Sequence, residues 1–398
     1  MNLPISYVPK IIVAPDSFKG VLKAPEAALA IADGVRKGLR KIFPYRECRI
    51  ETIPVADGGE GTAEVLAKAC GALPVEVETL SPLLEPIKAS YHFLPNEGDE
   101  CPRAFIDLAA ASGLPLVPPP RRNPLDTSTF GTGILIADAI RRGARDIIIG
   151  AGGSATVDGG AGALQALGAT FTDTEGTLMT EPLRGLDLER IAGINTIPGF
   201  MRDISITIAT DVTAPLTGPT GAAMVFAPQK GASREETIYL DAALGKFAHT
   251  LQQCGFADVA SLSGSGAAGG FAAGMAAVAG AILRPGALMV LDAVEMADRL
   301  QGASLMITGE GCADGQTLME KAPFATMRMA RESRMPVLLL AGRIKEKERL
   351  MDAGFTDVID INEGHDSGED SLDPDIARRR LEAAAFNAVC RLFQTRNA

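Results

Sequence analysis

The run Lys10-Ile-Ile-Val-Ala14, with the loop Pro15 to Lys23 and the helical pattern of Pro25 to Arg40 behind it, decides the fold. Four consecutive apolar residues are typical of a strand buried on both faces, as in parallel sheets. A proline in the first turn of the next segment favours the start of a helix. The chain therefore opens with a strand, a loop and a helix.

The same alternation continues along the chain. Strands are predicted at 50–55 and 74–80 around a helix at 62–70, and again at 303–308, 337–341 and 357–361 among helices at 323–334, 345–353 and 375–392. This order predicts an α/β fold with a Rossmann-like, doubly wound parallel sheet of six strands. We expect a discontinuous Rossmann-like domain, 1–80 and 292–398, and an inserted α/β domain, 81–291.

Composition limits the function. The chain has 398 residues, 46% of them hydrophobic and 22% charged, which is typical of a soluble globular protein. A net charge of −11 argues against nucleic acid and anionic membranes as partners. Scattered cysteines and the lack of a signal-like N-terminal segment predict a cytoplasmic protein. We expect a monomer or homodimer that acts on a small molecule.

Acidic residues follow several predicted strands. Ligands of open parallel sheets bind beyond the carboxyl ends of strands, and carboxylates there either ligate Mg²⁺ or accept a proton from a hydroxyl group. The acids at these positions are Asp16, Asp57, Glu60, Asp211, Glu310 and Asp314. A helix cap or a turn would also explain any single one of them.

A glycine-rich loop, residues 150–160, follows a predicted strand at 146–149. Glycines let the backbone approach a ligand, and the N–H groups ahead of a helix favour anions. A tight turn that needs positive φ is the alternative. The loop is therefore expected to bind an anion, with Ser154 and Thr156 as hydroxyl donors and Lys230 among the candidate cations.

A second glycine motif, Gly264-Ser-Gly-Ala-Ala-Gly269, fits G-x-G-x-x-G and leaves an NAD(P)-dependent hydroxyacid dehydrogenase as an alternative. The segment before it, 258–263, is a poor strand, so close packing of a Gly/Ala helix is favoured. Cations, a glycine-rich loop and carboxylates without a histidine base favour phosphoryl transfer, which depends on positioning and charge neutralisation. A sensor that binds its ligand without catalysis is a third possibility.

Several motifs together resemble the bacterial glycerate kinase family. They are Ala14-Pro-Asp-Ser-Phe-Lys-Gly20, Pro54-Val-Ala-Asp-Gly-Gly-Glu-Gly-Thr62, Gly152-Gly-Ser-Ala-Thr-Val-Asp-Gly-Gly160, Ala227-Pro-Gln-Lys-Gly-Ala232 and Ile307-Thr-Gly-Glu-Gly311. The resemblance implies phosphorylation of D-glycerate at the 2-hydroxyl by ATP with Mg²⁺, although a kinase for another small hydroxyacid is also compatible.

With this resemblance, roles are expected for individual residues. Asp57, Glu60 and Glu310 are the candidate Mg²⁺ ligands, and Asp211 is the first candidate for the catalytic base and Asp16 the second. The residues expected to hold the phosphates of ATP are Gly150, Gly152, Gly153, Ser154 and Thr156, with Gln229 and Lys230. We expect Ser17 and Lys19 to bind the glycerate carboxylate or the transferred phosphoryl group, with Lys19 also catalytic. Asp314 and Gln316 are expected to bind the substrate. The chain departs from the usual family residues at Lys23, Val157, Ala227 and Cys312.

Overall fold

The computed structural model describes residues 9–18, 20–44, 47–59, 61–95, 101–195, 199–319, 321–364 and 373–394. It divides into two compact units, Met1–Asp57 with Ala287–Ala398, and Gly58–Gly286. Each unit has its own sheet flanked by helices, so the predicted α/β class is confirmed. That the two units are independent domains is our proposal, with the first boundary at Asp57 instead of residue 80.

The first unit contains a five-stranded sheet in the order β13-β12-β11-β1-β2, in which all neighbours are parallel. Ile11, Ile12 and Val13 of the central strand have no exposed surface, as the apolar run predicts. The strands are β1 (Lys10–Val13), β2 (Arg49–Thr52), β11 (Leu305–Glu310), β12 (Val337–Ala341) and β13 (Asp357–Asp360). The helices are α1 (Ala24–Ile42), α10 (Met296–Leu300), α11 (Ala322–Glu332), α12 (Lys347–Ala353) and α13 (Pro374–Gln394), with α9 (Gly286–Ala293) beginning at the boundary.

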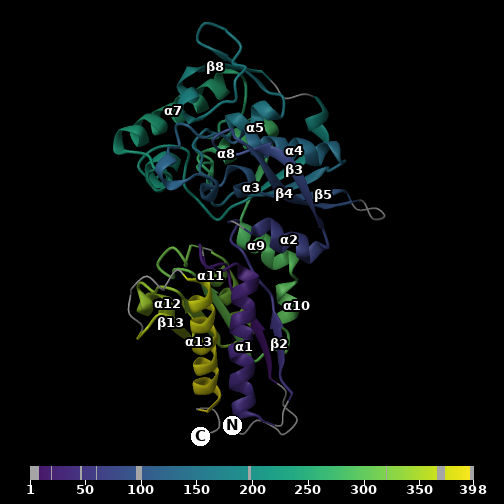
Figure 1. Cartoon of the computed structure of the whole chain (residues 1–398), viewed down its shortest axis with the longest axis vertical. Helices are drawn as coiled ribbons and strands as arrows, with labels where there is room; N and C mark the ends of the chain where they lie inside the picture. Colours follow the sequence, from purple (N-terminus) through teal and green to yellow (C-terminus); the bar gives the residue numbers. More distant parts are fainter. Residues whose placement is uncertain are drawn as a thin grey trace. The chain divides into compact units, whose positions relative to one another are not determined.

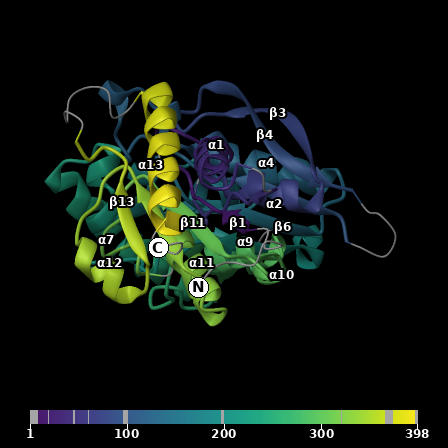
Figure 2. The same ribbon diagram turned by 90° about the horizontal axis from the view of Figure 1, so that it is seen from below.

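The first and last helices of this unit lie side by side (Figures 1 and 2). Gly34 of α1 makes the close approach possible, because a Cβ there would lie 2.1 Å from the carbonyl oxygen of Glu382. Lys37 forms an ion pair with the Glu382 side chain, and the rings of Phe43 and Phe393 meet edge to face. The α1–α13 pair therefore joins the two ends of the chain across one face of the sheet.

The start of α1 explains one departure from the family pattern. Lys23 lacks a hydroxyl group for capping, but the Glu26 carboxylate accepts a hydrogen bond from the Lys23 N–H at 2.9 Å. Arg40 and Lys41 lie in the last turn, where their positive charges interact favourably with the negative end of the helix dipole. The helix thus has favourable charges at both ends without a serine or threonine cap.

The second unit contains a six-stranded sheet in the order β10-β9-β6-β5-β4-β3 and a two-stranded antiparallel sheet. Strands β10, β9, β6 and β5 run parallel, whereas β4 and β3 are antiparallel additions at one edge. The strands are β3 (Leu73–Leu80), β4 (Pro86–Leu94), β5 (Arg103–Asp107), β6 (Asp146–Gly150), β9 (Ser205–Ala209) and β10 (Ile282–Arg284), with β7 (Thr170–Asp173) and β8 (Ile191–Asn195) in the small sheet.

The helices of the second unit surround a core that includes the fully buried Phe171, Phe247 and Phe271. None of the described helices is long and apolar enough to cross a membrane. The α-helices are α2 (Thr62–Cys70), α3 (Ala109–Ser112), α4 (Phe130–Arg141), α5 (Ala161–Ala166), α6 (Ala222–Phe226), α7 (Arg234–Gln253) and α8 (Phe271–Ala279). The 3₁₀-helices are η1 (Leu114–Leu116), η2 (Pro119–Arg121), η3 (Gly185–Arg190), η4 (Gly199–Asp203) and η5 (Pro228–Lys230).

One topological prediction is wrong. The third strand, β3, does not enter the parallel sheet of the first unit but pairs with β4 in antiparallel register, Val77 opposite Ala89. The first unit therefore has five strands instead of six. The alternating pattern of β3 predicts a strand with one buried face. The pattern does not show which sheet contains the strand that pairs with it.

Candidate functional site

Three predicted acids of the first unit follow neighbouring strands. Asp16 comes after β1, Asp57 after β2, and Glu310 ends β11. Because β11, β1 and β2 are adjacent and parallel, their carboxyl ends share one edge of the sheet. The Asp16 N–H donates to the Gly309 carbonyl oxygen at 2.8 Å, and the Val55 N–H donates to Pro15 at 3.0 Å, which ties the segments together. Of their predicted companions, Lys19 and Glu60 lie outside the described residues.

Glu310 is 6% exposed and its Oε1 accepts a hydrogen bond from Thr317 Oγ1 at 2.7 Å. Thr317 Oγ1 also accepts from the N–H of Asp314 at 3.0 Å, and Asp314 in turn accepts from the N–H of Gln316. Lys345 Nζ lies 3.9 Å from Asp314. The loop after β11 is thus folded around its own acids, with Gln316 exposed at its surface.

The donor chemistry of this edge fits Mg²⁺ only in part. Within the described ranges, no group of three or more His, Cys, Asp or Glu side chains is placed to hold a metal ion. Mg²⁺ is commonly held by one or two carboxylates together with the phosphates of a substrate. Asp57 and Glu310 fit this way of binding Mg²⁺, in which the protein supplies a minority of the ligands.

A second set of predicted residues meets at the carboxyl edge of the parallel strands in the second unit. Strands β5, β6 and β9 end there at Asp107, Gly150 and Ala209, and Thr210-Asp211 follow directly. The Ala151 N–H donates to Ala209 at 3.2 Å, and the Gly152 N–H donates to the Gly58 carbonyl oxygen at 3.1 Å. This edge gathers the glycine-rich loop, Asp211 and Gly58 into one surface region.

The backbone at position 58 requires a glycine. Its φ is +84°, and a Cβ there would lie 2.7 Å from the carbonyl oxygen of Ala209. Only glycine accepts both the left-handed backbone and the close approach. Gly58 is therefore fitted to the end of β9, immediately before Asp211.

The glycine-rich loop uses only some of its N–H groups internally. The N–H groups of Ala151, Gly152, Ala155, Gly159 and Gly160 all bond to protein oxygens. Those of Gly153, Ser154, Thr156, Val157 and Asp158 have no acceptor in the part of the chain that the structure describes. Of these residues Gly153 is exposed and Ser154 is 7% exposed, whereas Thr156, Val157 and Asp158 have no exposed surface, so Gly153 and Ser154 are the donors that solvent can reach.

Asp158 holds the far end of the loop. It is fully buried and accepts hydrogen bonds from the N–H and Oγ1 of Thr129, both at 2.7 Å, and from the Gly160 N–H at 3.1 Å. Burial raises the pKa of this carboxyl group, and the hydrogen bonds that it accepts partly oppose the rise. The carboxylate fixes the loop to the first turn of α4.

Lys230 is also buried, with 4% of its surface exposed. Its Nζ donates to the Thr156 carbonyl oxygen and lies 2.8 Å from Ser154 Oγ and from that carbonyl oxygen alike. Burial lowers the pKa of Lys230 to about 7, and the charge of Asp158 acts in the opposite direction. The neighbouring Gln229 is exposed. Lys230 therefore contacts the glycine-rich loop from its buried side. Direct contact between Lys230 and ATP stays a prediction.

Asp107 is a residue that the sequence analysis missed. Its carboxylate accepts hydrogen bonds from the N–H of Gly61 at 3.2 Å and of Ala63 at 3.0 Å, at the start of α2. A Cβ on Gly150 would lie 2.7 Å from Asp107 Oδ1, so the glycine makes room for it. Its position as the last residue of a strand is the signal that identified the other acids.

The second glycine motif serves packing. No strand precedes Gly264, and the motif leads through turns into α8. A Cβ on Gly269 would lie 2.0 Å from the Thr156 carbonyl oxygen, and one on Gly266 would lie 2.3 Å from that of Pro215. These contacts favour the predicted close-packing role over a dinucleotide-binding one.

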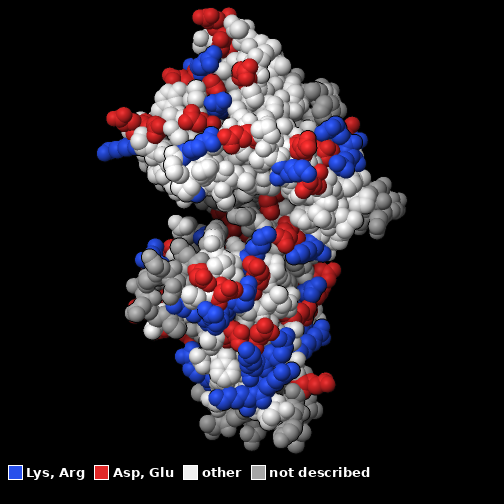
Figure 3. All heavy atoms as spheres, viewed as in Figure 1, with Lys and Arg blue, Asp and Glu red and all other residues white. Residues whose placement is uncertain are grey.

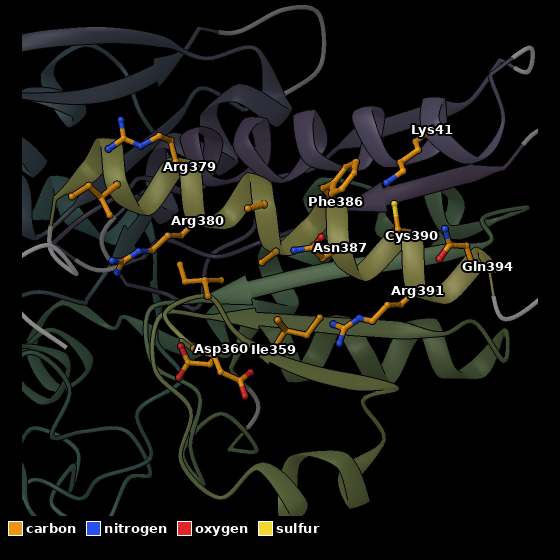
Figure 4. A pocket seen from close by; sticks show the side chains of 15 residues that line it. Lys41, Ile359, Asp360, Arg379, Arg380, Phe386, Asn387, Cys390, Arg391 and Gln394 are labelled. Carbon is orange, nitrogen blue, oxygen red and sulfur yellow. The ribbon is translucent and has the colours of Figure 1, made fainter. Parts of the chain in front are cut away.

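A pocket of about 960 Å³ lies elsewhere, along α13 in the first unit (Figure 4). Lys41, Arg379, Arg380 and Arg391 line it together with Asp360, and basic side chains are visible on the face that carries α1 and α13 (Figure 3). None of the residues predicted from the sequence lines this pocket. Its position therefore adds nothing to the candidate site.

Comparisons with known proteins agree with the motifs. The model of the glycerate kinase family matches residues 11–394. The glycerate 2-kinase of Escherichia coli K12 is 41% identical over 337 residues, which cover 85% of this chain and 86% of that protein. The glycerate kinase of Bacillus subtilis 168 is 42% identical over 84% of this chain and 85% of its own length. A crystal structure from Salmonella typhimurium LT2, assigned as glycerate kinase 2, has a TM-score of 0.78 and 40% identity and covers 98% of this chain and 100% of its own.

Proposed function

Because the chain belongs to the glycerate kinase family, we propose that it transfers the terminal phosphoryl group of ATP to the 2-hydroxyl group of D-glycerate. The products are 2-phospho-D-glycerate and ADP. The family match over residues 11–394 is the observation that carries this proposal, and the name of the Escherichia coli relative supports the 2-position.

In this reaction the 2-hydroxyl oxygen forms a bond to the γ-phosphorus while the bond from that phosphorus to the bridging oxygen of ADP breaks. The hydroxyl proton must be accepted during transfer, and Asp211 is the proposed base. Its place directly after β9, beside the glycine-rich loop, supports this role. Asp16 is the second candidate.

The phosphates of ATP are proposed to bind the glycine-rich loop. The N–H groups of Gly153 and Ser154 are the donors of this loop that solvent can reach and for which the described residues supply no acceptor. Gly150 and Gly152 leave space for the backbone to approach the ligand, and Thr156 shares the loop. Such fixed donors lower the barrier of phosphoryl transfer by stabilising charge on the phosphoryl oxygens.

The edge of the first unit is proposed to bind the acid substrate and the metal ion. Ser17, Asp314 and Gln316, with Lys19, are the candidates for D-glycerate. Asp57 and Glu310, with Glu60, are the candidates for Mg²⁺, which when bound supplies positive charge that neutralises phosphate oxygens. All six cysteines are free thiols, which supports the proposed cytoplasmic location.

The test is formation of ADP by the purified protein with D-glycerate, L-glycerate or tartronate as acceptor. We expect D-glycerate to be the preferred acceptor and phosphorus NMR to identify the 2-phosphate. No ADP formation with D-glycerate would overturn the proposal. Oxidation of NADH with hydroxypyruvate would favour the dehydrogenase instead.

A further inference from the structure

The contacts of Lys230 go beyond its expected role in holding the phosphates of ATP. The two oxygens at its amine belong to Ser154 and Thr156, which lie two residues apart in the glycine-rich loop. Among the described residues this amine has hydrogen bonds to these two oxygens and no ion pair, so no carboxylate fixes its charge by direct pairing. The amine therefore connects η5 to Ser154, which has a hydroxyl group, an N–H group without an acceptor among the described residues, and some exposed surface.

We propose that Lys230 is a positioning residue that turns the Ser154 hydroxyl group towards an anion bound at the glycine-rich loop. The inference rests on the proposed binding of ATP phosphates there. A lysine ammonium group has three donors and no acceptor. When Lys230 donates to Ser154 Oγ, the hydroxyl hydrogen must point elsewhere, and it joins the N–H groups of Gly153 and Ser154 as a donor to the ligand.

A neutral Lys230 has the opposite effect. Its lone pair accepts the Ser154 hydroxyl hydrogen, while its own N–H still donates to the Thr156 carbonyl oxygen. The loop keeps its shape in both states, but in the neutral state it loses one donor to the anion and one nearby positive charge. Anion binding and protonation of Lys230 consequently favour each other.

The surroundings of Lys230 allow this change within the physiological range. Burial lowers its pKa to about 7, and Asp158 is the charged group that raises it. Helix α6, which packs against η5, contains no titratable side chain. Arg122 lies against Gly231 through its backbone carbonyl oxygen, and its guanidinium Nε donates to Val117 at 3.3 Å. Binding of an anion beside Lys230 raises this pKa further.

Calorimetric titration with ATP, in two buffers of different ionisation enthalpy, tests the proposal on the full-length protein. At about pH 8 we expect the wild type to take up a proton on binding, approaching one per ATP, and at about pH 6 almost none. Lys230→Met is expected to take up none at either pH and to bind ATP about tenfold more weakly at pH 6. Lys246→Met is the matched control, because Lys246 is exposed in the same unit and, among the described residues, bonds to the Glu189 carbonyl oxygen alone.

Ser154→Ala separates orientation from charge and keeps the buried lysine. It is expected to bind ATP severalfold more weakly than the wild type at pH 6, with a smaller difference at pH 8, where the wild-type hydroxyl group faces Lys230. Equal ATP affinity of wild type and Ser154→Ala at both pH values would overturn the proposal, as would ATP binding by the wild type without proton uptake at pH 8.

Two further readouts keep the outcomes distinct. Urea unfolding of Lys230→Met shows whether the loss of affinity comes from a damaged fold, and Ser154→Ala decides the question if that variant does not fold. ADP formation with D-glycerate in the absence of linked proton uptake would refute the role of Lys230 and leave the proposed function standing. Failure of the wild type both to bind ATP and to form ADP would refute both.

Discussion

Asp211 stands at the carboxyl end of β9, half-buried and next to the residues that hold Gly58. We expect Asp211→Asn to lower kcat by about 10²- to 10⁴-fold, the usual contribution of a general base, because the amide cannot accept the hydroxyl proton. The unfolding midpoint should stay unchanged, since the amide has the same shape. Steady-state kinetics with D-glycerate and ATP give the measurement.

The control for this substitution is Asp258→Asn, an exposed acid of the same unit whose carboxylate accepts only the Ala260 N–H. It should retain normal turnover. If folded Asp211→Asn turns over normally while Asp16→Asn does not, Asp16 takes the role of the base.

Asp158 gives a pH-dependent contribution to stability. Burial raises its pKa above the ordinary value of 3.8, so the folded state binds this proton more tightly than the unfolded chain does. The contribution to the free energy of unfolding is therefore fully present below the ordinary pKa and is lost as pH rises through the raised pKa.

A comparison of the wild type with Asp158→Asn tests the direction of this pH dependence. The difference in the free energy of unfolding, wild type minus variant, should fall as the pH rises from about 4, by about 1.4 kcal/mol for each unit of pKa shift. Urea unfolding at a series of pH values measures it. A difference that increases with pH would show that the folded protein lowers the pKa of Asp158.

For single residues, the sequence predicts which residues lie at the site better than it predicts their burial and contacts. Asp16, Asp57 and Glu310 could be placed at one sheet edge because each follows a parallel strand. The burial of Lys230 could not be predicted, because it depends on η5 packing under a loop more than 70 residues away in the chain. Asp107 was missed because its strand was not recognised.

The turn into α8 allows a prediction about an element. Gly269 and Gly280 flank this helix and both have a φ of +69°, but a Cβ on Gly269 would lie 2.0 Å from the Thr156 carbonyl oxygen, whereas one on Gly280 would have no neighbour within 4 Å. Gly280→Ala should cost about 1–2 kcal/mol, the usual penalty of the left-handed conformation.

Gly269→Ala should cost more than that, by about 1–3 kcal/mol for the added overlap, and should weaken ATP binding because Thr156 must move. Urea unfolding of the two variants gives the comparison. Equal losses of stability would mean that the loop adjusts freely around the added methyl group.

The helices and parallel strands could be predicted because apolar runs and 3.6-residue periods depend on local sequence. The predicted helix at 62–70 coincides with α2, and the predicted strand at 337–341 coincides with β12. The sheet that β3 joins could not be predicted, since pairing with β4 depends on a neighbour that comes later in the chain.

For the whole molecule, the two compact units predict two unfolding transitions, since each buries its own apolar core. Val389→Ala, in α13, should shift only the transition of the first unit, and Leu164→Ala, in α5, only that of the second, the latter by about 2–5 kcal/mol. Far-UV circular dichroism in urea measures both. One transition that both variants shift equally would refute two independent domains.

The pairing of β1 with β11 has a consequence for biosynthesis. Ile11 lies opposite Leu305, so the first hydrophobic strand emerges from the ribosome long before its partner has been translated. At about 5–20 residues per second this interval lasts roughly 15–60 s. All of Gly58–Gly286 is translated during that wait. The apolar N-terminal strand thus has no β11 partner during this interval, and the sheet of the first unit is completed only after most of the chain has been translated.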